Sequence, residues 1–312
     1  MTILLSSLAI GNAAYKDLAY LCVQSFKEYR YPYKFIWEFL VENQESKEEW
    51  LRLLKSLEEP WLKFRVEVLK DSTTNLSIDK YVDKSFSNPT AAKCFINRIK
   101  YLQDTAKKKE FDYMITLDLD LLFIKNISPL IKDFINSNAI YGGKQEPLAV
   151  VYDQQRLVYI NLGMGLINLK RFPLNIWEEF LDKSRGAEEY FYVHDQSALC
   201  HFIEDKDKWI RNDLQLVVHA LWHPAFRAKR EYYVIHFTPA YVFRNKIKDM
   251  KYCTNMHNTV VLKYFHLYYN HYLKHKDHIS KQTQEILEHN NKVISLFNKM
   301  PHIQNMYDTY SI

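Results

Sequence analysis

The sequence predicts an α/β fold built on a mostly parallel sheet. Strand-like apolar runs alternate with segments of helical periodicity over the first third of the chain, and this alternation is typical of parallel strands covered by helices on both faces. The 47% hydrophobic content is enough for a large buried core. Asp118 and Asp120 follow the fourth strand-like run, and such sheets bind ligands beyond the carboxyl ends of their strands.

The individual elements follow from the spacing of apolar residues. In the first half we expect strands at residues 2–10, 33–41, 62–70 and from Tyr113 onward, and helices at 13–29, 46–57 and 91–108, with a polar loop at 85–90. The second half is less regular, with strands expected at 139–144, 159–169 and 231–239, and helices at 172–184, 194–204 and twice between 261 and 300. We expect one compact domain, residues 1–245, and a helical, basic C-terminal extension, residues 246–312.

Composition excludes several classes of protein. Aromatic residues at 15% and only six glycines argue against disorder. Cys22, Cys94, Cys200 and Cys253 are far apart and form no CxxC pair, which argues against a disulfide framework or structural zinc site and favours a reducing, cytoplasmic location. The first apolar run lacks a basic leader and is too short to span a bilayer, so we expect a buried strand there.

The net charge of +5 does not indicate a nucleic-acid partner. From Arg244 onward, however, basic residues outnumber acidic ones roughly two to one. This region could contact the inner face of a membrane peripherally, but a solvated surface explains the same charges and is favoured. His271, His275 and His278 fall at helical spacing there and could hold a transition metal, but the neighbouring Lys274 and Lys276 favour a solvated or anion-facing helix.

Asp118 and Asp120 in YMITLDLDLLF are the leading candidates for function. On a regular strand, alternate residues share one face of the sheet, where two close carboxylates repel and are costly to bury without a cation or several donors. Mg²⁺ and Mn²⁺ commonly bind one or two protein carboxylates together with phosphate oxygens. The alternative is a strand end that emerges into solvent.

Four short motifs in order, DLD, NLGMGLINLKRF, HDQSAL and VIHFTP, resemble the GT-A nucleotide-sugar glycosyltransferases. The chain is most similar to retaining family 8 enzymes such as glycogenin and the bacterial lipooligosaccharide galactosyltransferases. The resemblance covers roughly residues 2–240. It implies a Rossmann-like GT-A fold and the transfer of a hexose from a nucleotide-diphosphate sugar, with UDP as the expected nucleotide, to a hydroxyl of a glycan, lipid-linked saccharide or protein.

The same resemblance implies a metal site. Asp118 and Asp120 match the family's manganese ligands, and His236 matches the third ligand, although a buried strand histidine bonded to backbone is an alternative for His236. Mg²⁺ could replace Mn²⁺. The family's glycine and lysine after this histidine are absent, since Thr238 and Pro239 follow, so Arg244 or Lys246 would have to supply the positive charge at the diphosphate.

Further donor contacts are implied residue by residue. Asp195 and Gln196 match the family's Asp-Gln pair near the reacting sugar, although Asp195 could simply cap a helix. Asn161, Gly163 and Gly165 match a strand that approaches donor and acceptor, but the glycines could mark a bulge. The remaining expected donor contacts are Ala9, Ile10, Gly11 and Tyr15 at the base and ribose, Lys93 and Arg98 on the preceding helix, and Asp118, Leu119 and Arg244 at the phosphates. For Lys93 and Arg98 a helix-surface charge is the alternative.

Two other functions stay open from the sequence. A phosphotransferase can use an Asp-x-Asp as nucleophile and acid, but it usually has Thr or Val two residues later, near the first strand, whereas Leu122 stands here after five elements. A nucleotide- or glycan-binding module without activity is the third reading, because the glycine after His236 is missing. The stereochemical outcome is also open: an inverting enzyme would use a carboxylate such as Asp195 as general base.

Overall fold

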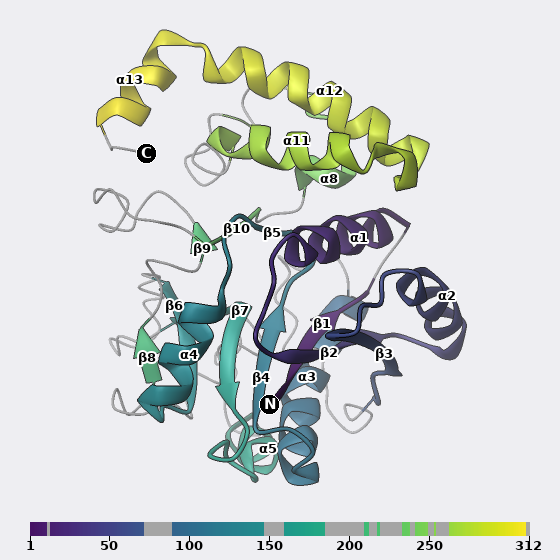
Figure 1. Ribbon diagram of the computed structural model, residues 1–312, viewed down its shortest axis with the longest axis vertical. Coiled ribbons are helices and arrows are strands. Elements are labelled where there is room, and N and C mark those ends of the chain that lie inside the picture. Colours follow the sequence, from purple (N-terminus) through teal and green to yellow (C-terminus); the bar gives the residue numbers. More distant parts are fainter. Residues whose placement is uncertain are drawn as a thin grey trace. The chain divides into compact units, whose positions relative to one another are not determined.

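The computed structural model (Figure 1) describes residues 1–10, 13–71, 89–146, 159–184, 209–211, 217–218, 233–237, 241–248, 253 and 262–309. The chain divides into two compact units, each made of three chain segments. Unit 1 contains Met1–Ile10, Tyr31–Leu117 and Ser128–Asn212, and unit 2 contains Gly11–Arg30, Asp118–Ile127 and Asp213–Ile312.

Unit 1 is built on a sheet whose described strands have the order β3-β2-β1-β4-β7-β6-β8. These strands are β1 (Thr2–Leu8), β2 (Lys34–Val41), β3 (Leu62–Val68), β4 (Tyr113–Leu117), β6 (Tyr141–Glu146), β7 (Tyr159–Asn168) and β8 (Trp209–Arg211). The first four strands in the chain run parallel, whereas β7 is antiparallel to both β4 and β6. The expected mostly parallel sheet is therefore confirmed.

The described helices of unit 1 are α2 (Gln44–Lys55), α3 (Pro89–Lys108), α4 (Ser128–Ser137) and α5 (Ile176–Ser184). Helix α3 covers the sheet with Ile99 and Leu102, which join Met114 of β4 in one buried cluster. Helices α3 and α4 are each followed by a residue with left-handed backbone, Lys109 at φ 54° and Asn138 at φ 58°, a common way to end a helix.

Tyr141 and Thr116 require a glycine at position 165 of β7. A methyl group at Gly165 would lie 2.8 Å from the hydroxyl oxygen of Tyr141 and 3.0 Å from Oγ1 of Thr116. The Gly165 N–H also donates to Oγ1 of Thr116 at 3.1 Å. This close approach gives Gly165 a packing role inside the sheet. The pairing of β6 with β7 also shifts register between Gly143 and Gln145, opposite Gly165 and Ile160, so an irregularity of the kind considered from the sequence lies in this stretch of β7.

Unit 2 is mainly helical, with a small sheet. Its described elements are α1 (Ala13–Lys27), β5 (Leu121–Phe123), β9 (Val217–Val218), β10 (Val234–His236), α8 (Tyr241–Arg244), α11 (Phe265–Lys274), η4 (Lys276–His278), α12 (Lys281–Asn298) and α13 (Pro301–Thr309). The strands have the order β5-β10-β9, with β10 antiparallel to β5 and parallel to β9.

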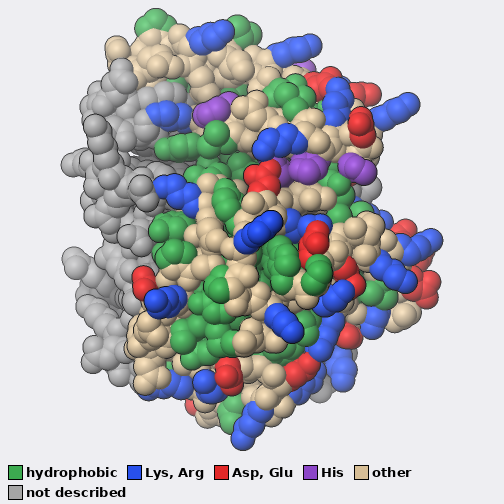
Figure 2. Space-filling model, in the orientation of Figure 1, with side chains coloured by type: hydrophobic (Ala, Val, Ile, Leu, Met, Phe, Trp, Pro, Cys, Tyr) green, Lys and Arg blue, Asp and Glu red, His purple; other side chains and the backbone are tan. Residues whose placement is uncertain are grey.

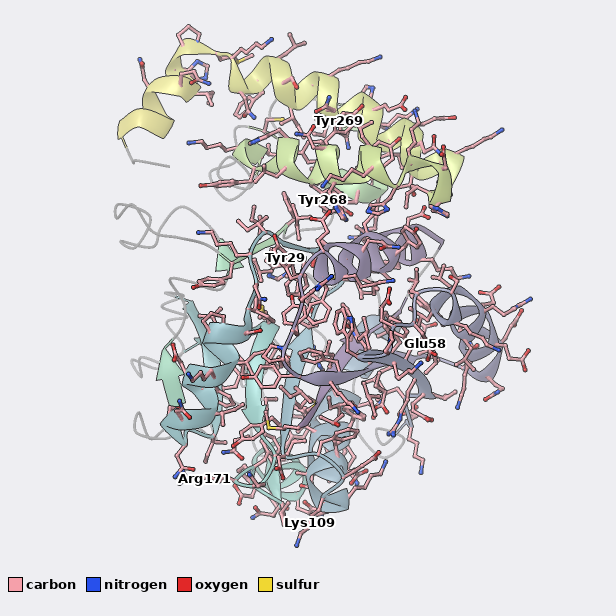
Figure 3. The ribbon with its side chains drawn as sticks, in the orientation of Figure 1. Tyr29, Glu58, Lys109, Arg171, Tyr268 and Tyr269 are labelled. Carbon is pink, nitrogen blue, oxygen red and sulfur yellow. The ribbon has the colours of Figure 1, made fainter. Side chains whose placement is uncertain are left out.

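An aromatic core joins the small sheet to the C-terminal helices. Phe237, directly after β10, contacts Tyr268 of α11 edge to face, with ring centroids 5.2 Å apart, and Phe243 of α8 lies 4.3 Å from Tyr268. Tyr268 and Tyr269 point to different sides of α11 (Figure 3), and Tyr268 is the fully buried member of the pair. Helix α12 is capped at its N-terminal end by Ser280, whose hydroxyl accepts from the Thr283 N–H and donates to Asp17 of α1.

Most long elements match the sequence-based expectations, with shifts at their ends. Of the loop expected at residues 85–90, Pro89 and Thr90 belong to α3, because proline is tolerated in a first helical turn, and residues 85–88 lie outside the described residues. Helix α4, strand β5 and helix α13 were not expected. The helix expected at 194–204 lies outside the described residues. Among the described helices, none has both the length and the apolar character needed to cross a membrane.

Candidate active site

Asp118 and Asp120 lie in the short connection between β4 and β5. Strand β4 is fully buried and ends at Leu117, so Asp118 is the first residue beyond it, and β5 begins one residue after Asp120. The chain bends between the two aspartates, and this bend brings their carboxylates together. They do not share one face of a regular strand, which was the arrangement expected from the sequence. Asp120 is buried and Asp118 is half-buried.

His236 reaches both carboxylates because of the pairing between β10 and β5. In this antiparallel pair His236 lies opposite Leu121, and the Phe237 N–H donates to the Asp120 carbonyl at 3.0 Å. Nε2 of His236 is consequently 3.1 Å from Oδ1 of Asp120 and 3.3 Å from Oδ2 of Asp118. Imidazole and carboxylate atoms from these three residues all lie within 4.8 Å of one another.

The electrostatics of this cluster favour a cation. Burial alone would lower the pKa of His236, but the charges of Asp120 and Asp118 and their hydrogen bonds outweigh it and raise the pKa to about 10. Two carboxylates facing one buried imidazole thus require positive charge between them. Two oxygen ligands and one imidazole nitrogen also form a donor set that suits Mn²⁺.

Helix α1 supports the turn that carries the aspartates. The Phe123 N–H donates to Oγ of Ser25 at 3.1 Å, and this hydroxyl donates to the Cys22 carbonyl at 2.8 Å. The rings of Phe26 and Phe123 meet edge to face at 5.1 Å. Burial, together with the charge of Asp120, raises the pKa of the Cys22 thiol, so this cysteine is an uncharged packing residue.

Tyr15 and Arg244, two of the expected donor-binding residues, lie together in unit 2. Nη1 of Arg244 donates to the Tyr15 hydroxyl at 2.9 Å, and the guanidinium carbon lies 5.3 Å from the centre of the tyrosine ring. Lys246 instead forms an ion pair with Glu285 of α12 at 3.3 Å. Arg244 and Lys246 were the two candidates to replace the family's phosphate-contacting lysine. Of these two, Arg244 contacts an expected nucleotide-binding residue, Tyr15, whereas the described ion pair of Lys246 is with Glu285.

The other expected site residues are distributed as follows. Ala9 is buried just beyond β1, where its N–H donates to the Leu40 carbonyl at 2.8 Å, and Ile10 follows it half-buried. Leu119 is buried between the two aspartates. Strand β7 contains Asn161 and Gly163, and helix α3 contains Lys93. The side chains of Asn161 and Lys93 are not described. Gly11, Asp195, Gln196, Thr238 and Pro239 lie outside the described residues.

Arg98 is buried, which contradicts the surface position considered for it from the sequence. Its side chain is only 1% exposed within α3, so the explanation as a helix-surface charge is wrong. The supporting roles of Cys22, Ser25 and Tyr268 were also missed, because a buried thiol, hydroxyl or tyrosine in an apolar helix gives no distinguishing sequence signal.

The fold is the GT-A fold, so the resemblance seen in the sequence is confirmed at the level of architecture. No protein-family model matches the sequence, and no curated protein matches it. Among solved structures, mouse xyloside xylosyltransferase 1 in its apo form matches with a TM-score of 0.58 and 18% identity over 77% of this chain and 98% of that one.

Two structures of the galactosyltransferase LgtC are similar as well. The complex with donor and acceptor sugar analogues matches with a TM-score of 0.55 and 15% identity, covering 86% of this chain and 95% of LgtC. An active-site mutant with glutamate in place of a glutamine matches with a TM-score of 0.56 and 17% identity, covering 84% and 94%. At these identities the comparisons define the fold.

Proposed function

We propose that the protein is a metal-dependent glycosyltransferase that moves a hexose from a nucleotide-diphosphate sugar, with UDP as the nucleotide, to a hydroxyl acceptor. The observation that carries the proposal is the convergence of Asp118, Asp120 and His236 within 4.8 Å, directly after a strand of a GT-A sheet. The neighbours with this fold include a xylosyltransferase and a galactosyltransferase bound to donor and acceptor analogues.

In this proposal Asp118, Asp120 and His236 hold Mn²⁺ or Mg²⁺. The bound ion would stabilise the negative charge that develops on the departing diphosphate, acting as a Lewis acid. The β5-β10 pairing fixes His236 against both aspartates before any ligand arrives, so little reorganisation is needed on binding.

Arg244 and Tyr15 form the second part of the proposed donor site. The guanidinium is held against the tyrosine ring and hydroxyl, and a fixed guanidinium can bind two phosphate oxygens at once. Asp195 and Gln196 are proposed to contact the donor sugar, by resemblance to the Asp-Gln pair of retaining enzymes. The LgtC mutant shows that a glutamine belongs to the active site of that protein. Retention at the anomeric carbon is part of the proposal.

The acceptor is proposed to be a glycan, a glycolipid or a protein. Three lysines of the C-terminal region form ion pairs: Lys246 with Glu285, Lys274 with Glu28, and Lys276 with Glu288. This pairing reduces the positive charge that the region presents, and it favours a solvated surface over a membrane-binding one.

The proposal is tested by replacing one metal-binding carboxylate. Asp120→Asn should lower Mn²⁺-dependent release of UDP from a UDP-hexose by about 100-fold or more, because the ion and the diphosphate lose an anionic ligand. A panel of UDP-sugars, screened first by thermal shift with Mn²⁺, identifies the donor to be used. Asp277→Asn is the matched control, since Asp277 is exposed in η4, and it should leave activity unchanged.

Three results would contradict the proposal. The first is the absence of Mn²⁺-dependent nucleotide binding in calorimetry, and the second is equal activity of Asp120→Asn and the unaltered protein. The third is nucleotide-independent hydrolysis of a simple phosphomonoester, which would point to the phosphotransferase alternative. NMR of the anomeric proton in early product separates retention from inversion.

A further inference from the structure

A second group of potential metal ligands lies in unit 2, formed by Glu28, His271 and His275. Glu28 directly follows α1, His271 lies in α11, and His275 caps the C-terminal end of α11. Their ligating atoms lie within 4.8 Å of one another. The sequence predicted a solvated or anion-facing helix here. His271 is only 4% exposed, so solvation is wrong for this residue, but its ring does face the Glu28 carboxylate. Figure 2 shows histidine side chains at the surface of this part of unit 2.

Hydrogen bonding fixes which nitrogen of His271 faces Glu28. Nε2 lies 3.0 Å from the Leu21 carbonyl, which can only accept, so Nε2 carries the hydrogen. Nδ1 lies 3.3 Å from Oε1 of Glu28. Burial lowers the pKa of His271, which favours the neutral ring. In that state a nitrogen lone pair faces a carboxylate oxygen, and a cation between the two would relieve their repulsion.

A histidine that donates one ring N–H to a backbone carbonyl while its other nitrogen points at a carboxylate is the arrangement of a metal ligand with its supporting partner. His275 lies one helical turn further along, with its ring centre 4.8 Å from that of His271. Burial and the neighbouring His271 lower the pKa of His275, which favours the neutral ring that a metal ion needs.

Glu28 supplies the anionic ligand. Burial would raise the pKa of its carboxyl, but the hydrogen bond and the charge of Lys274 lower it, so the group is a carboxylate at neutral pH. Two imidazoles and one carboxylate form a three-ligand set typical of Zn²⁺, which leaves a fourth position for water or another ligand.

The present counter-ion of Glu28 is Lys274, whose Nζ lies 3.0 Å from the same Oε1 that faces His271. The Lys274 side chain is 62% exposed, and exposed ion pairs of this kind are weak, so a divalent ion can displace the ammonium group. Lys276 does not compete, because it is paired with Glu288 at 2.6 Å.

We propose that Glu28, His271 and His275 form a binding site for Zn²⁺ or a similar transition-metal ion, separate from the Asp118, Asp120 and His236 cluster. An ion held there would fasten the end of α11 to the end of α1. The site therefore has a structural role and does not depend on the glycosyltransferase proposal.

Calorimetric titration of the full-length protein with Zn²⁺ tests this site, with Co²⁺ absorption as a second readout of nitrogen coordination. Asp118→Asn combined with Asp120→Asn serves as the background, so that metal binding at the other cluster is suppressed. In that background His275→Ala should lose one equivalent of Zn²⁺ or bind it roughly tenfold or more weakly. It should also lose the Zn²⁺-induced rise in Tm. His275 is the chosen position because it is only half-buried and its replacement is tolerated best.

Two further variants make the test specific. His278→Ala removes an exposed histidine three residues away, which stacks on Tyr20 at 5.3 Å, and it should leave Zn²⁺ binding unchanged. Lys274→Ala removes the competing ammonium group and should tighten Zn²⁺ binding several-fold. Unchanged stoichiometry and affinity in His275→Ala would overturn the proposal, and so would weaker binding in Lys274→Ala, which would identify the cluster as an ion-paired contact without a metal.

Discussion

Glu38 is a carboxyl group buried within β2, where its side chain accepts a hydrogen bond from the Tyr101 hydroxyl. Burial raises the pKa of Glu38, the Tyr101 hydrogen bond lowers it, and nearby Glu67 raises it, with a net increase. The nearby cation Arg65 is engaged elsewhere, since it bonds Glu110 at 2.6 Å. The ionised Glu38 side chain therefore lowers the stability of unit 1 at neutral pH.

This destabilisation predicts a pH-dependent effect of Glu38→Gln. Because the folded-state pKa lies above the unfolded one, the native state binds more protons between the two values, and stability falls as pH rises through the folded pKa. Glu38→Gln keeps the bond from Tyr101 and removes the charge. It should therefore be more stable than the unaltered protein at pH 7 to 8, and this advantage should shrink toward pH 4.

Urea unfolding across that pH range measures the effect. Glu48→Gln, at an exposed position in α2, is the control and should show no comparable trend. A difference between Glu38→Gln and the unaltered protein that stays constant with pH would contradict the prediction.

At the residue scale, the sequence indicated the site through charged residues at a position where an apolar strand ends. Two aspartates behind an apolar strand are costly without a cation, so Asp118 and Asp120 could be recognised, and His236 followed from the family resemblance. The positions of Asp118, Asp120 and His236 in the sequence do not say how far apart these residues lie in space, however. The 3.1 Å approach of His236 to Asp120 depends on a strand pairing between segments far apart in sequence. The cluster around Glu28 depends on packing of α11 against α1, which the sequence did not reveal.

Asn290 is the link between α12 and the segment that carries Arg244. Its Oδ1 accepts from the Ile247 N–H at 2.8 Å, and its Nδ2 donates to the carbonyls of Val242 at 2.7 Å and Asn245 at 2.8 Å. The side chain is fully buried. One asparagine therefore satisfies three backbone groups that surround Arg244.

We expect Asn290→Ala to lower the free energy of unfolding by roughly 2–4 kcal/mol, because three buried backbone groups lose their partner. Chemical denaturation measures this change. Asn291→Ala, at the neighbouring and only half-buried position, should change it by less than about 0.5 kcal/mol. Equal effects of the two substitutions would show that Asn290 does not hold this segment.

Elements with a long, regular apolar period were predicted well, and short ones were not. Strands β1 to β4 and helices α2 and α3 lie close to their expected bounds, because burial of one face imposes the period on the sequence. Strands β5 and β9 contain three and two residues, too few for a period, and pairing with distant segments defines them. Strand β10 lies inside the strand expected at 231–239, with His236 at its end. Helix α4 was also missed, although its buried residues Leu130, Ile131 and Phe134 lie on one helical face.

At the scale of the whole molecule, the C-terminal helices contribute to the same compact unit as the Asp118 cluster. Phe265, Tyr268 and Tyr272 of α11 and Leu287 of α12 are buried, and His271 bonds the Leu21 carbonyl of α1. The division into a domain of residues 1–245 and an extension of residues 246–312 stays a prediction. The burial in α11 and α12 favours the alternative, in which unit 2 needs these helices to fold.

Truncation decides between these possibilities. A chain that ends at residue 245 should lose cooperative unfolding of unit 2, because burying each large apolar side chain contributes about 1.5–3 kcal/mol and total stability is only about 5–15 kcal/mol. A chain that ends at residue 300, which lacks only α13, should unfold close to the full-length protein. Calorimetry measures both transitions, and an unchanged melting profile for residues 1–245 would establish the extension as an independent appendage.

Unit 2 is assembled from three chain segments that are synthesised at different times. Helix α1 leaves the ribosome well before α11 and α12, which it contacts within the unit. Chains fold as they emerge, N-terminal parts first, so the side of α1 that packs on α11 and α12 stays uncovered until those helices emerge, even after Phe26 has met Phe123 of β5. A nascent chain that contains α1 but not yet α11 therefore exposes apolar surface to chaperones and proteases, and a premature stop codon before α11 would leave that surface permanently exposed.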